Sequence, residues 1–413
     1  MEEARSVVLN NPLPFGPITA PAEVSAMRIG VVKESDQETR VAIVPSSLRK
    51  LTKSGFEVVV ESGAGLTSSH DDQAYIDAGA SIGTREEALS CPHVLSVGFP
   101  GVDGMAKGTN LVCVADPFRH PDRVKACMDA GITLMSMDMI PRRLSRAQSM
   151  DVNSSQDNLA GYKAVLLGAA HVPKGIPMMT TSAGTVRPAK IVVMGSGVAG
   201  LQAIATAKRL GAVVYASDVR KSAAEQIESV GGRFIEVDGM DDFEDASGYA
   251  KPLTPEFIQK VNDTVCGVAE DADIIVTTAR IFGRPAPITV PASAVANFKR
   301  GAVIVDMNAD VGGNCESTAA GEIVTTDNGV IVVGTSNLPG TLATTASMLY
   351  SNNLTTFMCS LVNEGEVVVS EEDDILVGAP EGSDFHVPGM GGVLICKDGA
   401  VHPKQTRLSE VVA

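Results

Sequence analysis

Short apolar runs alternate with amphipathic segments along most of the chain. The runs predict strands, at residues 27–33, 56–65, 93–99, 110–116, 132–139, 189–194, 212–218, 232–237, 272–279, 301–307 and 329–334. Apolar residues at helical spacing predict helices between several of these runs, at residues 39–55, 71–80, 121–131 and 201–211. Strands that alternate with helices are typical of βαβ units and a parallel sheet.

Two longer segments interrupt this alternation and have helical periodicity throughout. Residues 151–172 predict a helix that Ser154 or Ser155 can cap and that connects two domains. Residues 342–362 predict a second long helix that crosses back to the first domain. The expected fold class is therefore α/β, with two Rossmann-like, doubly wound parallel-sheet domains joined by long helices.

This organisation predicts two domains and an N-terminal segment. The N-terminal domain is expected to be discontinuous, with residues 27–153 and 345–413, and a second Rossmann-like domain to span residues 154–344. Residues 1–26 have neither a basic start nor an apolar stretch, so they are interpreted as a leader or linker and not as a secretory signal. The acidic tail after residue 363 is interpreted as a solvated face.

The strongest chemical signal is a glycine-rich turn, Gly195-Ser-Gly-Val-Ala-Gly200, between a predicted strand and a predicted helix. Gly195 permits a tight turn, Gly197 lets the backbone approach a pyrophosphate, and Gly200 allows the helix to pack closely on the strand. The N–H groups at the start of the helix favour a phosphate there. This spacing in this context predicts a dinucleotide site.

Asp218 ends the next predicted strand, 18 residues after Gly200. A carboxylate at that position can accept both hydroxyl groups of a ribose, and it repels the 2′-phosphate of NADP. The sequence therefore favours NAD over NADP. Arg220, two residues further on, weakens this preference because a 2′-phosphate prefers an arginine.

Composition narrows the possible functions. The 413 residues carry 33 Lys and Arg against 49 Asp and Glu, a formal net charge of −16, which disfavours binding to nucleic acid or to an anionic membrane. Seven cysteines and six histidines are scattered without the spacing of a metal site, so no metal is expected. No stretch reaches about 18 uninterrupted apolar residues, so no membrane span is expected.

Seven sequence blocks give the chain a resemblance to the NAD(H)-binding domain I, or alpha subunit, of proton-translocating nicotinamide nucleotide transhydrogenase. They are RVAIVP (40–45), PRRLSRAQSMD (141–151), SSQDNLAGYKAV (154–165), GSGVAGLQAIATAKRLGAVVYASDVR (195–220), SGYAK (247–251), GRPAP (283–287) and DMNADVGGN (306–314). The resemblance covers residues 27–413, and SRAQSMD with its continuation is the most specific part. This family shares its two-domain fold with alanine dehydrogenase.

The resemblance implies roles for residues in the loop between the domains. In the family this loop holds Arg, Gln, Asp and Ser around the nicotinamide, and the last three match Gln148, Asp151 and Ser154. Counting back from Gln148 gives Arg143 as the arginine. Arg142 competes for that role, because the loop has one residue more than the usual family pattern.

The family also closes a mobile loop over bound NAD with a tyrosine, which matches Tyr249 in SGYAK. The residues that the resemblance implies to be catalytic are Arg143, Gln148, Asp151, Ser154 and Tyr249. The residues expected to bind the cofactor are Arg142, Arg143, Leu144, Ser145, Arg146, Gln148, Gly195, Gly197, Val198, Ala199, Gly200, Asp218, Val219, Arg220, Gly248, Tyr249, Val261 and Arg280.

Alanine dehydrogenase is the main alternative within this resemblance. It would have a lysine in the strand at 93–99 and a histidine at the end of the strand at 110–116. The first strand has no lysine and the second ends in Asp116, with His120 four residues beyond it in a predicted loop. Pyruvate chemistry needs a cation and a general acid, so amino-acid dehydrogenation is disfavoured. A non-catalytic NAD-binding module is a further alternative.

The implied reaction is hydride transfer between NADH on this chain and NADP+ on a partner domain, in the proton-translocating, Si-to-Re stereospecific class. Hydride passes directly between two nicotinamide rings, so no protein acid, base or nucleophile is required. The implied partners are a second copy of this chain, an NADP(H)-binding domain and a proton-translocating membrane domain. The expected location is the soluble face of an energy-transducing membrane, bacterial (cytoplasmic side), mitochondrial or of another organelle.

Overall fold

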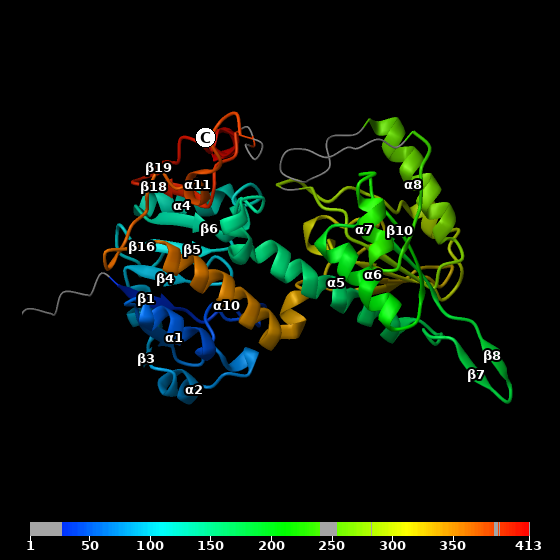
Figure 1. The fold of residues 1–413 in the computed structure, drawn as a ribbon, viewed down its shortest axis with the longest axis horizontal. Coiled ribbons are helices and arrows are strands. Elements are labelled where there is room, and N and C mark those ends of the chain that lie inside the picture. The colour runs from blue at the N-terminus through cyan, green and yellow to red at the C-terminus, as the bar shows by residue number, and fades with distance from the viewer. Residues whose placement is uncertain (1–26, 240–253, 282, 384–386, 388, 413) are drawn as a thin grey trace, which may run out of the picture.

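The computed structural model describes residues 27–239, 254–281, 283–383, 387 and 389–412. Two separate sheets form the centres of two bodies that lie side by side, and a long helix runs from one body into the other (Figure 1). Gly248 and Tyr249 lie outside the described residues, so the predicted closing loop is not part of the description. In the described part of the chain, no helix has both the length and the apolar character needed to cross a membrane.

The first sheet has eight strands and a parallel centre. Its order is β19 (Ala400–Val401), β18 (Leu394–Lys397), β6 (Thr133–Ser136), β5 (Asn110–Cys113), β4 (His93–Leu95), β1 (Arg28–Val31), β2 (Glu57–Glu61) and β3 (Ser81–Gly83). The six strands from β6 to β3 pair in parallel, whereas β18 and β19 pair antiparallel. Numbered within the parallel set, the order is that of a doubly wound sheet.

The second sheet repeats this plan with seven strands. Its order is β11 (Arg233–Phe234), β10 (Val213–Ser217), β9 (Lys190–Met194), β12 (Ile274–Thr277), β13 (Val303–Asp306), β15 (Ile331–Val333) and β14 (Ile323–Thr325). Only β14 is antiparallel. The strand order reverses between β9 and β12, and ligands of open α/β sheets bind at such a switch point. The predicted α/β class with doubly wound parallel sheets is confirmed.

Helices connect and cover the strands. They are α1 (Pro45–Lys53), α2 (Asp72–Asp77), α3 (Arg85–Leu89), α4 (Pro121–Ala130), α5 (Val152–His171), α6 (Val198–Arg209), α7 (Ala223–Ser229), α8 (Pro255–Ala269), α9 (Ala292–Val295), α10 (Ala343–Ser360), α11 (Asp374–Val377) and α12 (Thr406–Val412). Two short hairpins, β7 (Met179–Thr181) with β8 (Gly184–Val186) and β16 (Val362–Asn363) with β17 (Glu366–Val367), lie outside the two sheets. The β7–β8 hairpin projects away from the second body (Figure 1).

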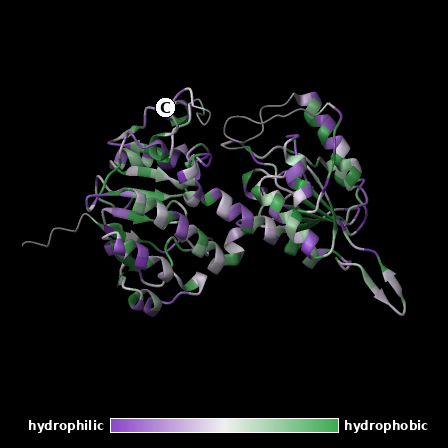
Figure 2. Ribbon diagram, in the orientation of Figure 1, coloured by the Kyte–Doolittle hydropathy of each residue, from purple (hydrophilic) through white to green (hydrophobic). Residues whose placement is uncertain are grey.

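The central strands are buried on both faces, which explains their continuous apolar runs. Every residue of Ile274–Thr277 and of Val303–Asp306 is buried. In Figure 2 the strands are predominantly hydrophobic, while many helices carry both kinds of residue. Burial from both sides is what covering helices impose on a parallel sheet, so the apolar runs locate the strands well.

The two long helices cross between the bodies, as the sequence predicts. Helix α5 packs along α6 and contacts α10, and Gly161 sets its distance from α6. A Cβ at Gly161 would lie 2.0 Å from the carbonyl oxygen of Ala199. The prediction of a serine cap on α5 is wrong: Asp151 is the N-cap, and its Oδ1 accepts the N–H of Ser154 at 2.9 Å.

Several predicted elements are shorter in the structure, and in two of them other groups take the backbone hydrogen bonds. The predicted strand at 93–99 ends at Leu95, since the N–H groups of Val97 and Gly98 bind the Glu34 carboxylate. The predicted helix at 39–55 begins only at Pro45, because the preceding backbone binds serine hydroxyls of α10. The predicted strand at 232–237 is reduced to the short edge strand β11.

The C-terminal tail is more than a solvated acidic face. Strand β18 inserts three buried residues, Leu394–Cys396, beside β6 in the first sheet. Asp373 and Asp374 pair with Arg146, whereas Glu371 and Glu372 are exposed. The interpretation of the tail as solvated therefore holds for only part of it, because an acidic composition does not reveal the apolar strand that follows.

Candidate functional site

The glycine-rich turn connects β9 to α6 and approaches neighbouring backbone closely at Gly195 and Gly200. Gly195 has a φ of +98°, which favours glycine, and its N–H donates to the carbonyl of Ser217 at 2.9 Å. A Cβ at Gly200 would lie 2.0 Å from the carbonyl oxygen of Gly195. By contrast, a Cβ at Gly197 would have no atom within 4 Å. The backbone at Gly197 therefore faces open space, which suits a pyrophosphate.

This turn lies at the wall of a large cleft of about 1530 Å³ that both bodies line. The cleft is larger than the pockets of about 300–1,000 Å³ that enclose most small ligands, so it has room for a dinucleotide. The residues predicted for cofactor binding that line it are Arg142, Arg143, Gly195, Gly197, Val198, Ala199, Asp218, Val219, Arg220, Val261 and Arg280. Those that do not are Leu144, Ser145, Arg146, Gln148 and Gly200, and the implied catalytic residues Asp151 and Ser154 do not line it either.

The cleft is basic although the chain is acidic. Among the described residues, eleven Lys and Arg side chains line it against seven Asp and Glu, whereas the whole chain carries a net charge of −16. A cleft lined mainly by one sign of charge concentrates ligands of the opposite sign. The local charge therefore suits a phosphate-bearing ligand.

Asp218 follows β10 and receives hydrogen bonds from two directions. Its Oδ2 accepts the N–H of Ser196 at 2.8 Å, which ties it to the glycine turn. Its Oδ1 accepts the N–H of Arg220 at 3.0 Å and the Nε of Arg220 at 2.8 Å. The carboxylate thus lies beside the turn at the end of its strand, where the sequence predicts a group that recognises a ribose.

The loop between the bodies is built around the Asp151 cap of α5. The Oγ of Ser154 donates to Asp151 Oδ2 at 2.5 Å. The Arg142 guanidinium donates to that Oγ at 3.3 Å and lies 3.7 Å from Asp151 Oδ2. Arg142 is half-buried and Arg143 is exposed. The structure therefore joins Arg142, Asp151 and Ser154 into one cluster at the edge of the cleft.

The rest of this loop points elsewhere. It forms a short 3-10 helix, Ser145–Met150, whose Ala147 and Met150 are buried while Gln148 is exposed. Arg146 pairs with Asp373 and Asp374 of the C-terminal segment. Gln148 and Arg146 are therefore separated from the cleft wall that Arg142 lines.

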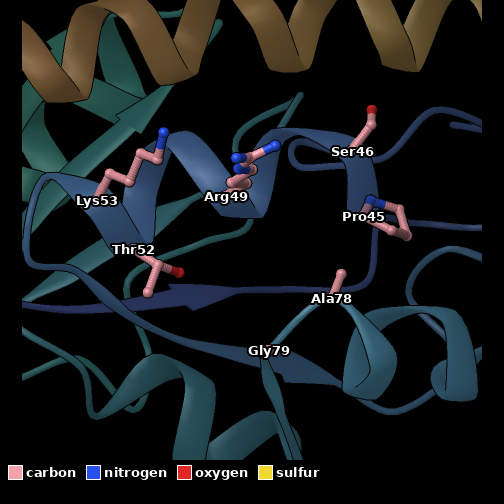
Figure 3. A pocket seen from close by; sticks show the side chains of 7 residues that line it. All are labelled: Pro45, Ser46, Arg49, Thr52, Lys53, Ala78 and Gly79. Carbon is pink, nitrogen blue, oxygen red and sulfur yellow. The ribbon is translucent and has the colours of Figure 1, made fainter.

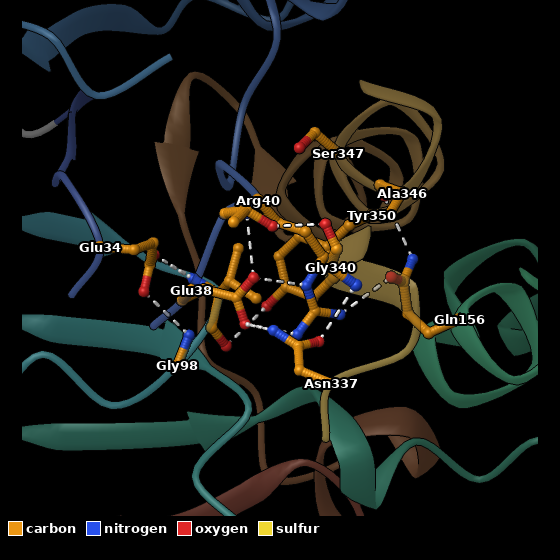
Figure 4. A network of polar contacts seen from close by, with 12 residues as sticks. Glu34, Glu38, Arg40, Gly98, Gln156, Asn337, Gly340, Ala346, Ser347 and Tyr350 are labelled. Carbon is orange, nitrogen blue, oxygen red and sulfur yellow. Dashed lines mark hydrogen bonds and ion pairs between the residues drawn. The ribbon is translucent and has the colours of Figure 1, made fainter. Parts of the chain in front are cut away.

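A polar network that sequence reasoning missed holds the first body to the crossing helices (Figure 4). Arg40 donates to both oxygens of Glu38 at 2.8 and 2.7 Å and to Gln156 of α5 at 2.9 Å. Asn337 donates to Glu38 at 3.2 Å, and Gln156 donates to the carbonyl of Ala346 in α10 at 3.2 Å. One signal was present: Arg40 is a charged residue that opens the buried apolar run Val41–Val44.

Within this network, Glu38 and Arg40 shift each other's pKa. Burial acts to raise the pKa of Glu38, but the hydrogen bonds and charge of Arg40 outweigh it and the pKa is lowered. Burial likewise acts to lower the pKa of Arg40, and Glu38 reverses this, so that the pKa is raised. Both groups stay charged near neutral pH, which is the state in which this bidentate pair is strong.

Two acids that sequence reasoning missed line the cleft, together with His120, which the sequence analysis weighed only for the alanine dehydrogenase alternative. Burial raises the pKa of Asp157 on α5, against the charges of Arg280 and Arg142. Burial also raises the pKa of Asp138 to about 6. His120, at the start of α4, lines the cleft, and burial lowers its pKa. The sequence offers no periodic or spacing signal for Asp138 and Asp157, because each belongs to a different segment.

The pH dependence of folding is expected to depend on Glu34. Burial raises its pKa from 4.5 to about 7, so the folded chain binds a proton there that the unfolded chain releases at lower pH. The free energy of unfolding should therefore fall as pH rises from about 4.5 to 7, by up to about 3 kcal/mol. In Glu34→Gln the decline should become smaller, and the part that remains comes from other carboxyls with a raised pKa, such as Asp138. Denaturant unfolding at a series of pH values measures this change.

The matched control for this prediction is Glu256→Gln, at an exposed carboxylate of α8. It should keep the decline of the parent chain. The comparison uses the slope against pH and not the absolute stability, because the substitution at Glu34 would also change the hydrogen bonds to Val97 and Gly98. An unchanged slope in Glu34→Gln would show that Glu34 titrates as an ordinary carboxyl.

A second, smaller hollow lies on the first body beside α1 (Figure 3). It has a volume of about 530 Å³. It is lined by Pro45, Ser46, Arg49, Thr52, Lys53, Ala78 and Gly79. None of the residues predicted for the site lies there, so the large cleft is the candidate functional site.

Comparison with known proteins assigns both halves of the chain. Residues 30–160 match the family model described as alanine dehydrogenase/PNT, N-terminal domain, and residues 164–382 match that described as alanine dehydrogenase/PNT, C-terminal domain. The chain is 43% identical over 396 residues to the first part of NAD(P) transhydrogenase subunit alpha of Rhodospirillum rubrum, covering 92% of this chain and 99% of that protein.

Solved structures of a transhydrogenase and of an alanine dehydrogenase are also similar to this chain. A transhydrogenase from Sinorhizobium meliloti is similar with a TM-score of 0.79 and 41% identity, covering 91% of this chain and all of that one. An L-alanine dehydrogenase is similar with a TM-score of 0.71 and 25% identity, covering 94% of this chain and all of that one. The overall fold is therefore similar to that of proteins of both kinds.

Proposed function

The chain belongs to the alanine dehydrogenase/PNT family, and from this premise we propose that it is the NAD(H)-binding component of a proton-translocating transhydrogenase. Part of a transhydrogenase alpha subunit and a transhydrogenase of solved structure are 43% and 41% identical to it. The proposed reaction is direct hydride transfer between NADH on this chain and NADP+ on a partner domain, of the Si-to-Re stereospecific class.

One observation carries the binding part of this proposal. The turn after β9 presents the open backbone of Gly197 and the start of α6 to a basic cleft, with Asp218 beside it. A pyrophosphate fits the helix N-terminus, and a ribose fits the carboxylate at the end of the next strand. These features together suit NAD(H) better than a nucleotide with a 2′-phosphate.

The proposed role of the protein is to position the nicotinamide and exclude water. When bound, NADH supplies the hydride from its nicotinamide ring. The Arg142 guanidinium and the Asp151–Ser154 pair lie at the edge of the cleft, where they would orient the ring and its ribose. Gln148 is exposed on the same loop, which suits contact with a nucleotide carried by a partner. Correct placement alone can supply much of the rate of such a transfer.

The proposal extends to the assembly. The partners are a second copy of this chain, an NADP(H)-binding domain and a membrane domain that translocates protons. The chain is placed as a peripheral component at the soluble face of an energy-transducing membrane. The domain division, 27–153 with 345–413 and 154–344, and the closure of the Gly248–Tyr249 loop over NAD stay predictions.

Mixing this chain with a purified NADP(H)-binding domain is expected to give rapid cyclic transfer from NADH to acetylpyridine-NAD in the presence of NADP(H). Each component alone should give only the background rate, because the two nicotinamides lie on different proteins. Absorbance of reduced acetylpyridine-NAD measures the rate, and calorimetric titration with NADH and NADPH measures which nucleotide binds this chain. A mixture no faster than its separate components would contradict the proposal.

An alanine dehydrogenase-like activity is the second candidate. It is favoured by the similarity to an L-alanine dehydrogenase and by the position of His120 in the cleft. It predicts oxidation of NADH by pyruvate and ammonia with this chain alone. We expect no such reaction, because strand β4 has no lysine to bind a carboxylate.

A further inference from the structure

Asp218 and Arg220 form a bidentate ion pair at the adenosine end of the proposed NAD site, and the following inference rests on that proposed function. Arg220 donates through Nε to Oδ1 at 2.8 Å and through Nη2 to Oδ2 at 3.1 Å. The Asp218 and Arg220 side chains are 8% and 15% exposed. A bidentate pair so shielded from solvent is strong and is little weakened by salt.

The Asp218 carboxylate has no spare acceptor capacity in this arrangement. An ionised carboxylate offers about four lone-pair positions. The two guanidinium bonds and the N–H groups of Ser196 and Arg220 make four donations. A ribose hydroxyl can bind Asp218 only if one of them opens. The backbone donors are fixed by the turn and by β10, so the Arg220 side chain is the donor that must move.

Arg220 stays beside the ribose when it moves. It lies two residues after Asp218, its side chain lines the same cleft, and its Nη2 also approaches the carbonyl of Ser196 at 3.5 Å. The guanidinium fork matches the geometry of a phosphate. An arginine in this region of a dinucleotide fold is the group that accommodates the 2′-phosphate of NADP.

We propose that Arg220 is a specificity-determining residue whose guanidinium binds a 2′-phosphate once Asp218 no longer holds it. The preference for NAD(H) then depends on the carboxylate of Asp218, which repels a 2′-phosphate and accepts hydrogen bonds from the arginine. The site therefore has both the carboxylate typical of an NAD(H) site, Asp218, and an arginine of the kind that binds NADP(H), Arg220. Neutralising Asp218 removes the repulsion of a 2′-phosphate and, at the same time, the ionic attraction between the carboxylate and the guanidinium of Arg220.

The test compares Asp218→Asn with the double variant Asp218→Asn/Arg220→Ala by calorimetric titration with NADH and NADPH. Asp218→Asn should bind NADH about tenfold more weakly and NADPH at least about tenfold more tightly than the parent chain does. The double variant should lose the gain for NADPH. The fragment adenosine 2′,5′-bisphosphate should follow NADPH, because the effect depends on the 2′-phosphate and not on the nicotinamide.

Two controls make the result specific. Arg209→Ala, added to Asp218→Asn, removes an exposed positive charge from the last turn of α6 and should leave NADPH affinity unchanged. Asp218→Ser replaces Asp218→Asn if the latter fails to melt cooperatively, since serine can still accept the N–H of Ser196. Equal NADPH affinity in the single and double variants overturns the role of Arg220 and leaves the proposed function intact. A parent chain that binds no NADH overturns both.

Discussion

The Gly197→Val variant is expected to lose no more than about 1 kcal/mol of folding stability, as an N-cap substitution does. It should bind NADH about a hundredfold more weakly, a loss of about 3 kcal/mol of binding free energy. The reason is local. A Cβ at position 197 meets no atom within 4 Å, and the backbone there has a φ of −71°, which any residue adopts. A valine side chain would instead fill the space in which the pyrophosphate approaches the start of α6. Calorimetric titration and thermal unfolding measure the two quantities separately.

Gly200→Ala gives the opposite pattern and serves as the control. Its Cβ would lie 2.0 Å from the carbonyl oxygen of Gly195, so the helix and the turn must separate. The expected result is a loss of stability of about 3 kcal/mol, in the range of severe packing defects. Unchanged NADH affinity in Gly197→Val would mean that the pyrophosphate lies elsewhere in the cleft. A Gly197→Val chain that unfolds early would contradict the geometry of the turn.

The order of strands and helices along the chain could be predicted because the burial of each element determines the pattern of apolar residues within it. Parallel strands covered on both faces are apolar throughout, and the long helices carry periodic apolar residues. The ends of the elements could not be predicted, because distant groups decide them. The segment after Leu95 has the composition of a strand, yet Glu34, more than 60 positions earlier in the chain, takes its N–H groups.

The parts of the site that could be predicted are made of residues near each other in the sequence, and the missed parts are made of residues far apart in it. The segment from Gly195 to Asp218 is a single run of 24 consecutive residues, so spacing alone reveals it. The Arg40 network joins Arg40 to Gln156 across 116 positions, and Glu38 to Asn337 across 299 positions. No periodicity connects such residues, and only the fold brings them together. The resemblance indicated Arg40 as part of a motif but gave it no role.

Arg142 lies in the loop between the bodies, at the edge of the cleft. Arg142→Ala is expected to lower the rate of transfer to NADP(H) on a partner about a hundredfold, while NADH affinity changes less than about tenfold. Arg142 donates to Ser154 and lies near Asp151, so its loss would leave the nicotinamide poorly oriented without removing the pyrophosphate and ribose contacts. Misplacement of reacting atoms by about 1 Å can cost about that much.

The comparison with Arg143→Ala decides between the two arginines. Counting along the family pattern assigns the role to Arg143, whereas the contacts with Asp151 and Ser154 favour Arg142. Arg143 is exposed, whereas the α5 cap orients the guanidinium of Arg142 at the cleft edge. The transfer rate of Arg143→Ala should therefore be at least about tenfold higher than that of Arg142→Ala. Arg142→Lys should restore part of the rate, because lysine keeps the charge but not the fork. If Arg143→Ala loses transfer and Arg142→Ala keeps it, the extra residue of the loop does not shift the pairing and the count along the chain is right.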